Sequence, residues 1–111
     1  MSSAASDRQS RLSVRVTRDG SSASVIITGD LDAHTAPELD GILGGVIALE
    51  DGPVIVDLSA IDFVGSAGAH SLLDARRELF GRGRRLELFG VPTTVARLLD
   101  IVGWDAAEPA A

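Results

Sequence analysis

The sequence predicts a single α/β domain in which a small four-stranded mixed sheet, begun by an N-terminal β-hairpin, carries about three main helices. Three observations support this class. Two segments with alternating apolar residues open the chain, two short apolar segments follow later, and three segments place apolar residues at helical spacing. The order is ββαβαβα, and right-handed crossovers in such an order leave the helices packed on the sheet.

The first half of the chain predicts a hairpin followed by a helix. Apolar residues alternate with polar ones over residues 12–16 and again over 23–27, with the turn Asp19-Gly20 between them. Thr35 then fits the N-cap of a helix. The apolar residues of this helix recur at helical spacing: Leu39, Ile42, Leu43, Val46 and Leu49.

The second half predicts two more strands and two more helices. The run from Val54 to Leu58 is typical of a strand covered on both faces. Ser66 fits the N-cap of a helix that extends to about Phe80. Leu86 and Leu88 mark the last strand, and a third helix ends near Gly103. The apolar arc of the second helix contains Ala69, Leu72, Leu73, Leu79 and Phe80, with Arg76 inside it.

Composition fits one domain with an aliphatic core. The chain has 111 residues, of which 45% are hydrophobic and only 4% aromatic. It has no cysteine, which excludes a disulfide scaffold and fits a reducing compartment. The net charge of −6 argues against a general binder of nucleic acid or of anionic membranes. The domain should span residues 11–104, between a disordered N-terminus at 1–10 and a flexible tail at 105–111.

Localisation is expected to be cytoplasmic. No apolar run approaches the length of a membrane span, and the first residues lack the apolar core of a signal peptide.

Ser66 is the most informative single residue, because it lies where a buried strand gives way to a helix. A hydroxyl there can cap the helix, and it faces the positive end of the helix dipole. A phosphoryl group on this oxygen would meet free backbone N–H groups. Capping alone accounts for most serines at such positions, so the surrounding segment has to decide between the two roles.

That segment, Asp57-Leu-Ser-Ala-Ile-Asp-Phe-Val-Gly-Ser-Ala-Gly68, resembles the signature of STAS domains, the anti-sigma factor antagonist family. A second segment, Gly29-Asp-Leu-Asp-Ala-His-Thr-Ala36, resembles the family's Gly-Glu-Leu-Asp stretch before the first helix. The resemblance covers about residues 12–104. It implies a non-enzymatic bacterial regulator without a cofactor. Such a protein binds an anti-sigma factor that is a serine kinase of the histidine-kinase-like ATPase fold, and so releases a sigma factor. Phosphorylation of Ser66 would break this binding, and a serine phosphatase would restore it.

The expected contact surface lies in two loops. In a ββαβα order, the loops before the first and second helices open on the same side of the sheet. The predicted contact residues are Gly29, Asp32, His34, Thr35, Asp62, Gly65, Ser66 and Gly68. We expect Asp32 to belong to this surface and not to act as a structural cap, since Thr35 already caps the helix. The family usually has Asp, Ser, Ser, Gly at its signature, whereas Gly65 and Ala67 stand here.

A non-phosphorylated module of the same family remains an alternative, acting as a scaffold or as the cytoplasmic accessory of a transporter. In that case Ser66 would be only a helix cap. A small hydrolase would have to use Ser66 with His70, one helical turn further on. However, Gly65-Ser66-Ala67-Gly68 does not match the G-x-S-x-G nucleophile elbow.

The remaining polar residues indicate no separate chemistry. His34 and His70, with Asp32 or Asp62, show no spacing known for a metal site. The Arg82, Arg84 and Arg85 cluster is expected to lie in a solvated loop. Trp104, the only tryptophan, should cover the end of the third helix.

Overall fold

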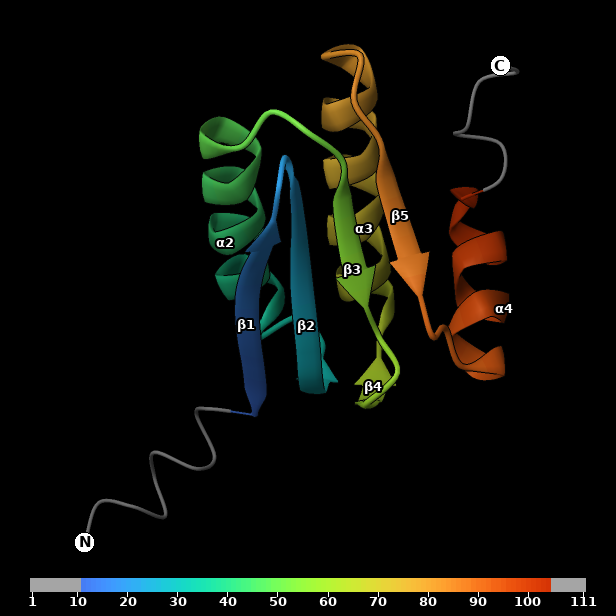
Figure 1. The fold of residues 1–111 in the computed structure, drawn as a ribbon. Coiled ribbons are helices and arrows are strands. Elements are labelled where there is room, and N and C mark those ends of the chain that lie inside the picture. Colours follow the sequence, from blue (N-terminus) through green and yellow to red (C-terminus); the bar gives the residue numbers. More distant parts are fainter. Residues whose placement is uncertain (1–10, 105–111) are drawn as a thin grey trace, which may run out of the picture.

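The computed structural model describes residues 11–104, so the expectations for residues 1–10 and 105–111 lie outside it. Within this range the chain forms five strands and three helices (Figure 1). In chain order they are β1 (Leu12–Asp19), β2 (Ser22–Leu31), α2 (Ala36–Leu49), β3 (Val54–Asp57), β4 (Ile61–Val64), α3 (Ser66–Gly81), β5 (Leu86–Phe89) and α4 (Thr93–Val102).

The strand order confirms the predicted mixed sheet and adds one strand. Antiparallel β1 and β2 form the N-terminal hairpin, and β3 and β5 continue the sheet in parallel, giving the order β1-β2-β3-β5. The β3 segment lies between two strands, which confirms that Val54–Val56 is an internal strand. The additional strand is β4, which pairs with the C-terminal end of β2 and lies between the predicted internal strand and the second predicted helix.

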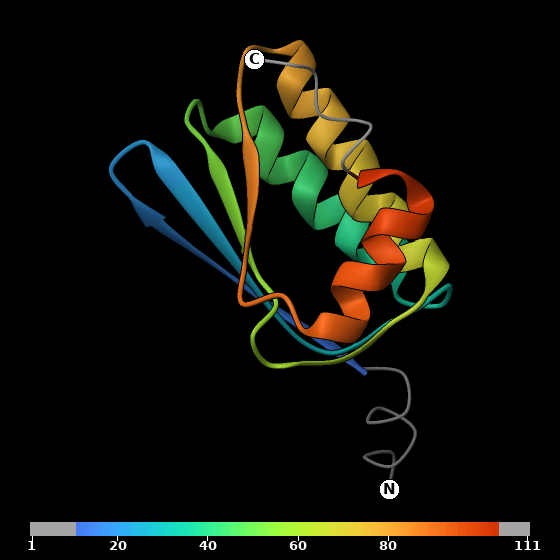
Figure 2. The ribbon, with the colours of Figure 1, turned by 90° about the vertical axis from the view of Figure 1, so that its right-hand side faces the viewer.

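All three helices pack on one face of the sheet (Figure 2). The side chains that point to this face alternate along the strands, and β2 buries Ala23, Val25 and Ile27 completely. The core is aliphatic, as the composition predicts. Its largest fully buried side chains are Ile27, Leu31, Leu39, Leu43, Leu58, Leu72, Leu73, Leu79, Val25, Val54 and Val56.

Two residues of the predicted apolar arcs are not in the core. Leu49 is 76% exposed and Phe80 is 56% exposed. Both lie in the last turn of their helices, where the neighbouring elements no longer cover them. The arc prediction was therefore wrong at the helix ends, because periodicity describes a face but not how far the packing partner extends.

Arg76 and Trp104 join α3 to the end of α4. The guanidinium carbon of Arg76 lies 4.3 Å from the centre of the Trp104 ring, and its Nη1 donates to the Trp104 carbonyl oxygen. Arg76 is only 9% exposed. Its place within the apolar arc is thus confirmed. Trp104 packs against the core at the end of the last helix, as predicted.

Arg84 joins three segments by hydrogen bonds at the end of the molecule opposite β4. Its Nε donates to the carbonyl oxygen of Gly52 at 3.1 Å, and its Nη1 donates to that of Ile47 at 2.7 Å. These bonds tie the loop between α3 and β5 to the C-terminal end of α2 and to the loop before β3. The expectation of a solvated arginine loop was therefore wrong for Arg84, whereas Arg82 and Arg85 are exposed as predicted.

Candidate functional site

The site begins where two parallel strands end side by side. The last residues of β2 and β4, Leu31 and Val64, are paired in the sheet, and the Gly65 N–H donates to the Leu31 carbonyl oxygen at 2.8 Å. The loop after β2 and the start of α3 therefore leave the sheet as neighbours (Figure 1). This confirms the adjacency expected from the element order.

A bulge shapes the β4 side of this site. Gly29 pairs with Ile61 and Asp30 with Phe63, so the register shifts by one and Asp62 has no pairing partner on β2. Asp62 is exposed. The residue left out of the ladder is therefore accessible at the surface of the domain.

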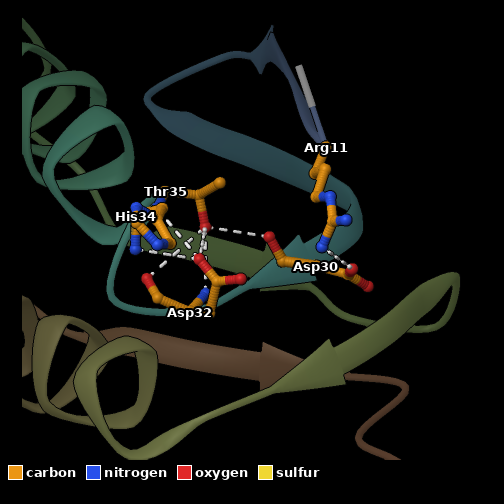
Figure 3. Close-up of polar contacts among 5 residues, drawn as sticks. All are labelled: Arg11, Asp30, Asp32, His34 and Thr35. Carbon is orange, nitrogen blue, oxygen red and sulfur yellow. Dashed lines mark hydrogen bonds and ion pairs between the residues drawn. The ribbon is translucent and has the colours of Figure 1, made fainter. Parts of the chain in front are cut away.

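The loop after β2 is held by a reciprocal pair, Asp32 and Thr35 (Figure 3). Asp32 Oδ1 accepts hydrogen bonds from the backbone N–H groups of His34 at 2.9 Å and Thr35 at 3.1 Å. Thr35 Oγ1 in turn accepts from the Asp32 N–H at 2.9 Å and donates to the Asp30 carbonyl oxygen at 2.8 Å. The loop thus folds back on itself immediately before α2.

The prediction that Asp32 does not act as a structural cap was wrong. Thr35 occupies the N-cap of α2, as predicted, but its side chain makes no capping bond to the helix. Its hydroxyl is turned back towards Asp30 and Asp32, and Asp32 instead receives the N–H groups that lead into the helix. A place for Asp32 on the binding surface is a separate matter and stays a prediction.

The electrostatics of Asp32 reflect these bonds. Partial desolvation raises the pKa of Asp32, but the hydrogen bonds from the Thr35 and His34 backbones and from the Thr35 hydroxyl outweigh it. The pKa of Asp32 therefore lies below its ordinary value. Arg11, immediately before β1, places its Nη1 3.6 Å from Asp30 Oδ2, so it pairs with the carboxylate two residues before Asp32 and not with Asp32 itself (Figure 3).

Ser66 is the first residue of α3 and is exposed. The N-cap is Gly65, whose extended backbone has φ −95° and ψ 178°, and no side chain makes a capping bond to this helix. The prediction that Ser66 is the N-cap was therefore wrong by one position. Its hydroxyl is not used by the helix, and the N–H groups of the first turn have no intrahelical partner.

Phe63 is a surface residue that the sequence analysis did not single out. It is 53% exposed and lies beside Gly65, where an added Cβ atom would stand 3.3 Å from its ring. It also lines a groove of about 150 Å³ together with Pro92 and Thr94 at the start of α4. A large aromatic residue between Asp62 and Gly65 was the available signal, since an aromatic ring between polar and glycine neighbours is a frequent contact residue.

The eight predicted contact residues differ in exposure. His34, Asp62 and Ser66 are exposed, Gly29, Asp32 and Gly65 are half-buried, and Thr35 and Gly68 are buried. Gly68 packs directly on Leu31: an added Cβ would collide with the Leu31 side chain and stand 2.8 Å from its carbonyl oxygen. Any part that Gly68 has in partner binding is therefore indirect, through the close approach of α3 to β2.

Ser66 and His70 are the two residues that the hydrolase alternative would need. Neither Ser66 nor His70, both exposed, has a hydrogen bond through its side chain within residues 11–104, so no base is held against the hydroxyl. No group of three or more His, Cys, Asp or Glu residues in the described range could hold a metal ion. None of the described helices is long and apolar enough to cross a membrane.

Known proteins resemble both the sequence and the fold. A family model described as "Mlab, STAS domain" matches residues 4–108. The anti-sigma-B factor antagonist of Listeria monocytogenes is 31% identical over 87 residues, which cover 78% of this chain and 75% of that protein. The anti-sigma-F factor antagonist RsfB of Mycobacterium tuberculosis is 29% identical over 94 residues, covering 85% and 76%. The crystal structure of an anti-sigma factor antagonist from Mycobacterium paratuberculosis superposes with a TM-score of 0.78 at 26% identity, covering 88% of this chain and 83% of that one.

Proposed function

This chain belongs to the STAS-domain family, and from that premise we propose that it is an anti-sigma factor antagonist. In this role it binds an anti-sigma factor of the serine-kinase type, with a histidine-kinase-like ATPase fold, and thereby releases a sigma factor in the bacterial cytoplasm. The relatives named above support the role, since both are anti-sigma factor antagonists by name. The single observation that carries the proposal is the exposed Ser66 hydroxyl at the uncapped start of α3, beside the Asp32 loop.

Phosphorylation of Ser66 is the proposed off-switch. A phosphate adds about −1.5 to −2 charges at neutral pH and a large hydration shell. The free N–H groups of the first turn of α3 and the helix dipole would stabilise this dianion in the unbound protein. In the complex the same dianion would have to be desolvated next to the exposed ring of Phe63 and the nearby carboxylates, which is costly without a cationic partner group. Binding to the kinase is therefore lost, and a serine phosphatase restores it.

Gly65 is the point at which this chain departs from the usual family pattern. The acid that normally precedes the phosphoacceptor is absent, and the place its Cβ would take lies 3.3 Å from the Phe63 ring. The kinase that modifies this chain would accordingly recognise an aromatic face before Ser66 instead of a carboxylate. We propose that this substitution matches the domain to its own anti-sigma factor.

The missing acid is also the observation that favours the second candidate, a non-phosphorylated STAS module that acts as a scaffold or as an accessory of a transporter. In that case Ser66 is never modified. Isolation of the native protein with its partners separates the two functions. An ATPase of the histidine-kinase-like fold identifies the sigma-factor switch, whereas a transporter ATPase identifies the alternative.

The direct test uses substitutions of Ser66 and measures affinity for the anti-sigma factor in the presence and absence of ATP. Ser66→Ala should bind at every ATP level, whereas wild-type protein should be released as it becomes phosphorylated. Ser66→Asp should bind at least tenfold more weakly with an unchanged circular dichroism spectrum. Ser21→Asp is the matched control, because it adds the same charge at the exposed hairpin turn, at the other end of β2. Equal affinity of Ser66→Ala and Ser66→Asp would rule out the switch.

A further inference from the structure

A groove of about 350 Å³ lies between β5 and α4. Its apolar lining comes from both elements and from the connection between them: Leu86, Leu88, Val91, Ala96 and Leu99. Figure 1 shows α4 on the side of β5 that faces away from β3. The groove therefore runs along the free edge of the sheet, with α4 as its outer wall.

Strand β5 carries unpaired backbone groups at this edge. It is the last strand of the sheet order, so only its β3 side is paired. The Val54 N–H of β3 donates to the Arg85 carbonyl oxygen at 2.9 Å. Because backbone groups of successive strand residues point to alternate sides, those of Glu87 also face β3, whereas those of Leu86 and Leu88 face away from it. Within the described part of the chain these groups of Leu86 and Leu88 have no hydrogen-bond partner. Unpaired N–H and C=O groups at a sheet edge are a template for another strand.

Acidic groups at the rim of the groove favour a basic strand. Asp100 on α4 is exposed and makes no ion pair among the residues that the structure describes. Glu87, on the outer face of β5, pairs only with the exposed Arg85, at 3.7 Å. A strand added to β5 places every second side chain beside Glu87 and the others over Leu88 and Leu99. The net charge of −6 attracts a basic segment further.

We propose that β5 accepts an extended segment of a partner protein as an added antiparallel strand, in which apolar residues alternate with lysine or arginine. The backbone of this segment pairs with Leu86 and Leu88. Its apolar side chains fill the groove against α4, and its basic side chains lie beside Glu87 and Asp100. Strand addition of this kind obtains affinity from main-chain hydrogen bonds and selectivity from alternate side chains.

An extended occupant fits this groove better than a helical one. The backbone groups of a helix are bonded within the helix, so a helical segment would leave the edge groups of Leu86 and Leu88 without partners. The groove shares no lining residue with the Ser66 site, so the proposal does not depend on the partner bound there.

The test is an NMR titration of the ¹⁵N-labelled full chain with a short acetylated, amidated peptide of alternating valine and lysine. We expect saturable shifts at the amides of Leu86, Leu88 and Ala96, and slower hydrogen exchange at Leu86 and Leu88. The amides of β1, the other edge strand, should not shift, because its exposed Arg15 disfavours a basic peptide. A peptide with valine and lysine in two separate blocks should bind at least tenfold more weakly.

Two N-methylated peptides test the strand pairing itself. In the antiparallel arrangement the valines lie opposite Leu86 and Leu88, so the valine N–H groups face β5 and the lysine N–H groups face away. Methylation of the valine nitrogens should therefore weaken binding at least tenfold, whereas methylation of the lysine nitrogens should leave it unchanged. Equal effects of the two methylations, or effects in the reverse order, would overturn the proposal.

A substitution in the protein tests the groove. Ala96→Trp fills it from the exposed face of α4 and should weaken binding at least tenfold. The matched control is Thr93→Trp, which adds the same side chain to an exposed position of the same helix outside the groove and should bind like the wild type. The amide spectrum reports whether each variant is folded.

Three outcomes of these measurements would contradict the proposed occupant. Equal weakening by Ala96→Trp and Thr93→Trp would show that the groove is not the binding site. Equal shifts at the β1 and β5 amides would show unselective pairing of sheet edges. Shifts at Leu86 and Leu88 that grow with protein concentration before any peptide is added would identify a second copy of this chain as the occupant.

Discussion

Replacement of Gly68 by alanine should destabilise the protein and disturb the Ser66 site, although alanine is normally the better helix residue. Gly68 is buried in the first turn of α3, directly against Leu31 at the end of β2. An added Cβ would stand 2.9 Å from Leu31 Cδ2 and 2.8 Å from the Leu31 carbonyl oxygen. That carbonyl oxygen is also the acceptor of the Gly65 N–H, the hydrogen bond that holds α3 against β2.

The expected magnitude follows from two opposing terms. Carbon atoms prefer separations of about 3.5–4.0 Å, so α3 and β2 would have to move apart by more than half an ångström. Overpacking of this kind costs about 1–3 kcal/mol, and the shift of the Leu31 carbonyl places this site at the upper end. The higher helix propensity of alanine raises the free energy of unfolding by about 1 kcal/mol and so offsets part of this cost. The net loss of about 2 kcal/mol corresponds to a melting temperature lower by about 8–16 °C for a domain of this size.

Thermal unfolding followed by circular dichroism measures this effect, and Gly44→Ala provides the matched control. Gly44 lies in the middle of α2 with nothing within 4 Å of an added Cβ, so the same substitution there should raise the melting temperature. Gly68→Ala should also weaken binding of the anti-sigma factor, because Ser66 moves with the start of α3. A Gly68→Ala variant as stable as Gly44→Ala would refute the packing argument.

Substitutions of three further residues, each with a comparison variant, test their individual roles. Asp32→Ala should lower the melting temperature at pH 7, whereas Asp32→Asn, which keeps the Oδ1 acceptor, should lower it less. The pKa of Asp32 is lowered in the folded protein, so its ionised form contributes fully to stability above the ordinary pKa of 3.8, and this contribution is lost as the pH falls through the folded pKa. The difference in melting temperature between wild type and Asp32→Ala should therefore shrink in acid. Identical melting temperatures of the two proteins at pH 7 would contradict this. Phe63→Ala should weaken binding of the anti-sigma factor by about 1.4 kcal/mol or more, tenfold in a titration, whereas Phe80→Ala, at a similarly exposed ring, should have no effect. Arg84→Ala should cost about 2 kcal/mol in chemical denaturation through its lost charged hydrogen bonds, and an equally small loss for Arg84→Ala and Arg85→Ala would show that the bonds to Ile47 and Gly52 contribute nothing.

Periodicity predicted the elements whose apolar residues repeat at regular spacing. The hairpin, the internal β3 strand and the three helices all follow from apolar spacing, because each element presents one face to a single core. The β4 strand was not predicted, since only Val64 of its four residues is buried and a bulge at Asp62 breaks its alternation. Short strands of this kind are determined by the strand they pair with and not by their own pattern.

The residues of the site were easier to predict than their individual roles. The order of the elements was enough to predict that the loops of Asp32 and Ser66 are neighbours, because the ends of parallel strands lie at the same edge of the sheet. The roles of the caps could not be read in the same way. Asp32 and Thr35 are both good capping residues, as are Gly65 and Ser66. Only the folded backbone decides that Asp32 accepts the N–H groups before α2, and that Gly65 takes the N-cap position of α3, where no side chain makes a capping bond.

The pairing of Leu31 with Val64 makes the proposed contact surface a discontinuous epitope. One part comes from the loop before α2 and the other from the start of α3, and one helix and two strands (α2, β3 and β4) separate them in the chain. A synthetic peptide that copies either segment would therefore present only half of the surface, without the geometry that joins the halves. A partner or an antibody that requires both segments distinguishes the folded domain from its fragments.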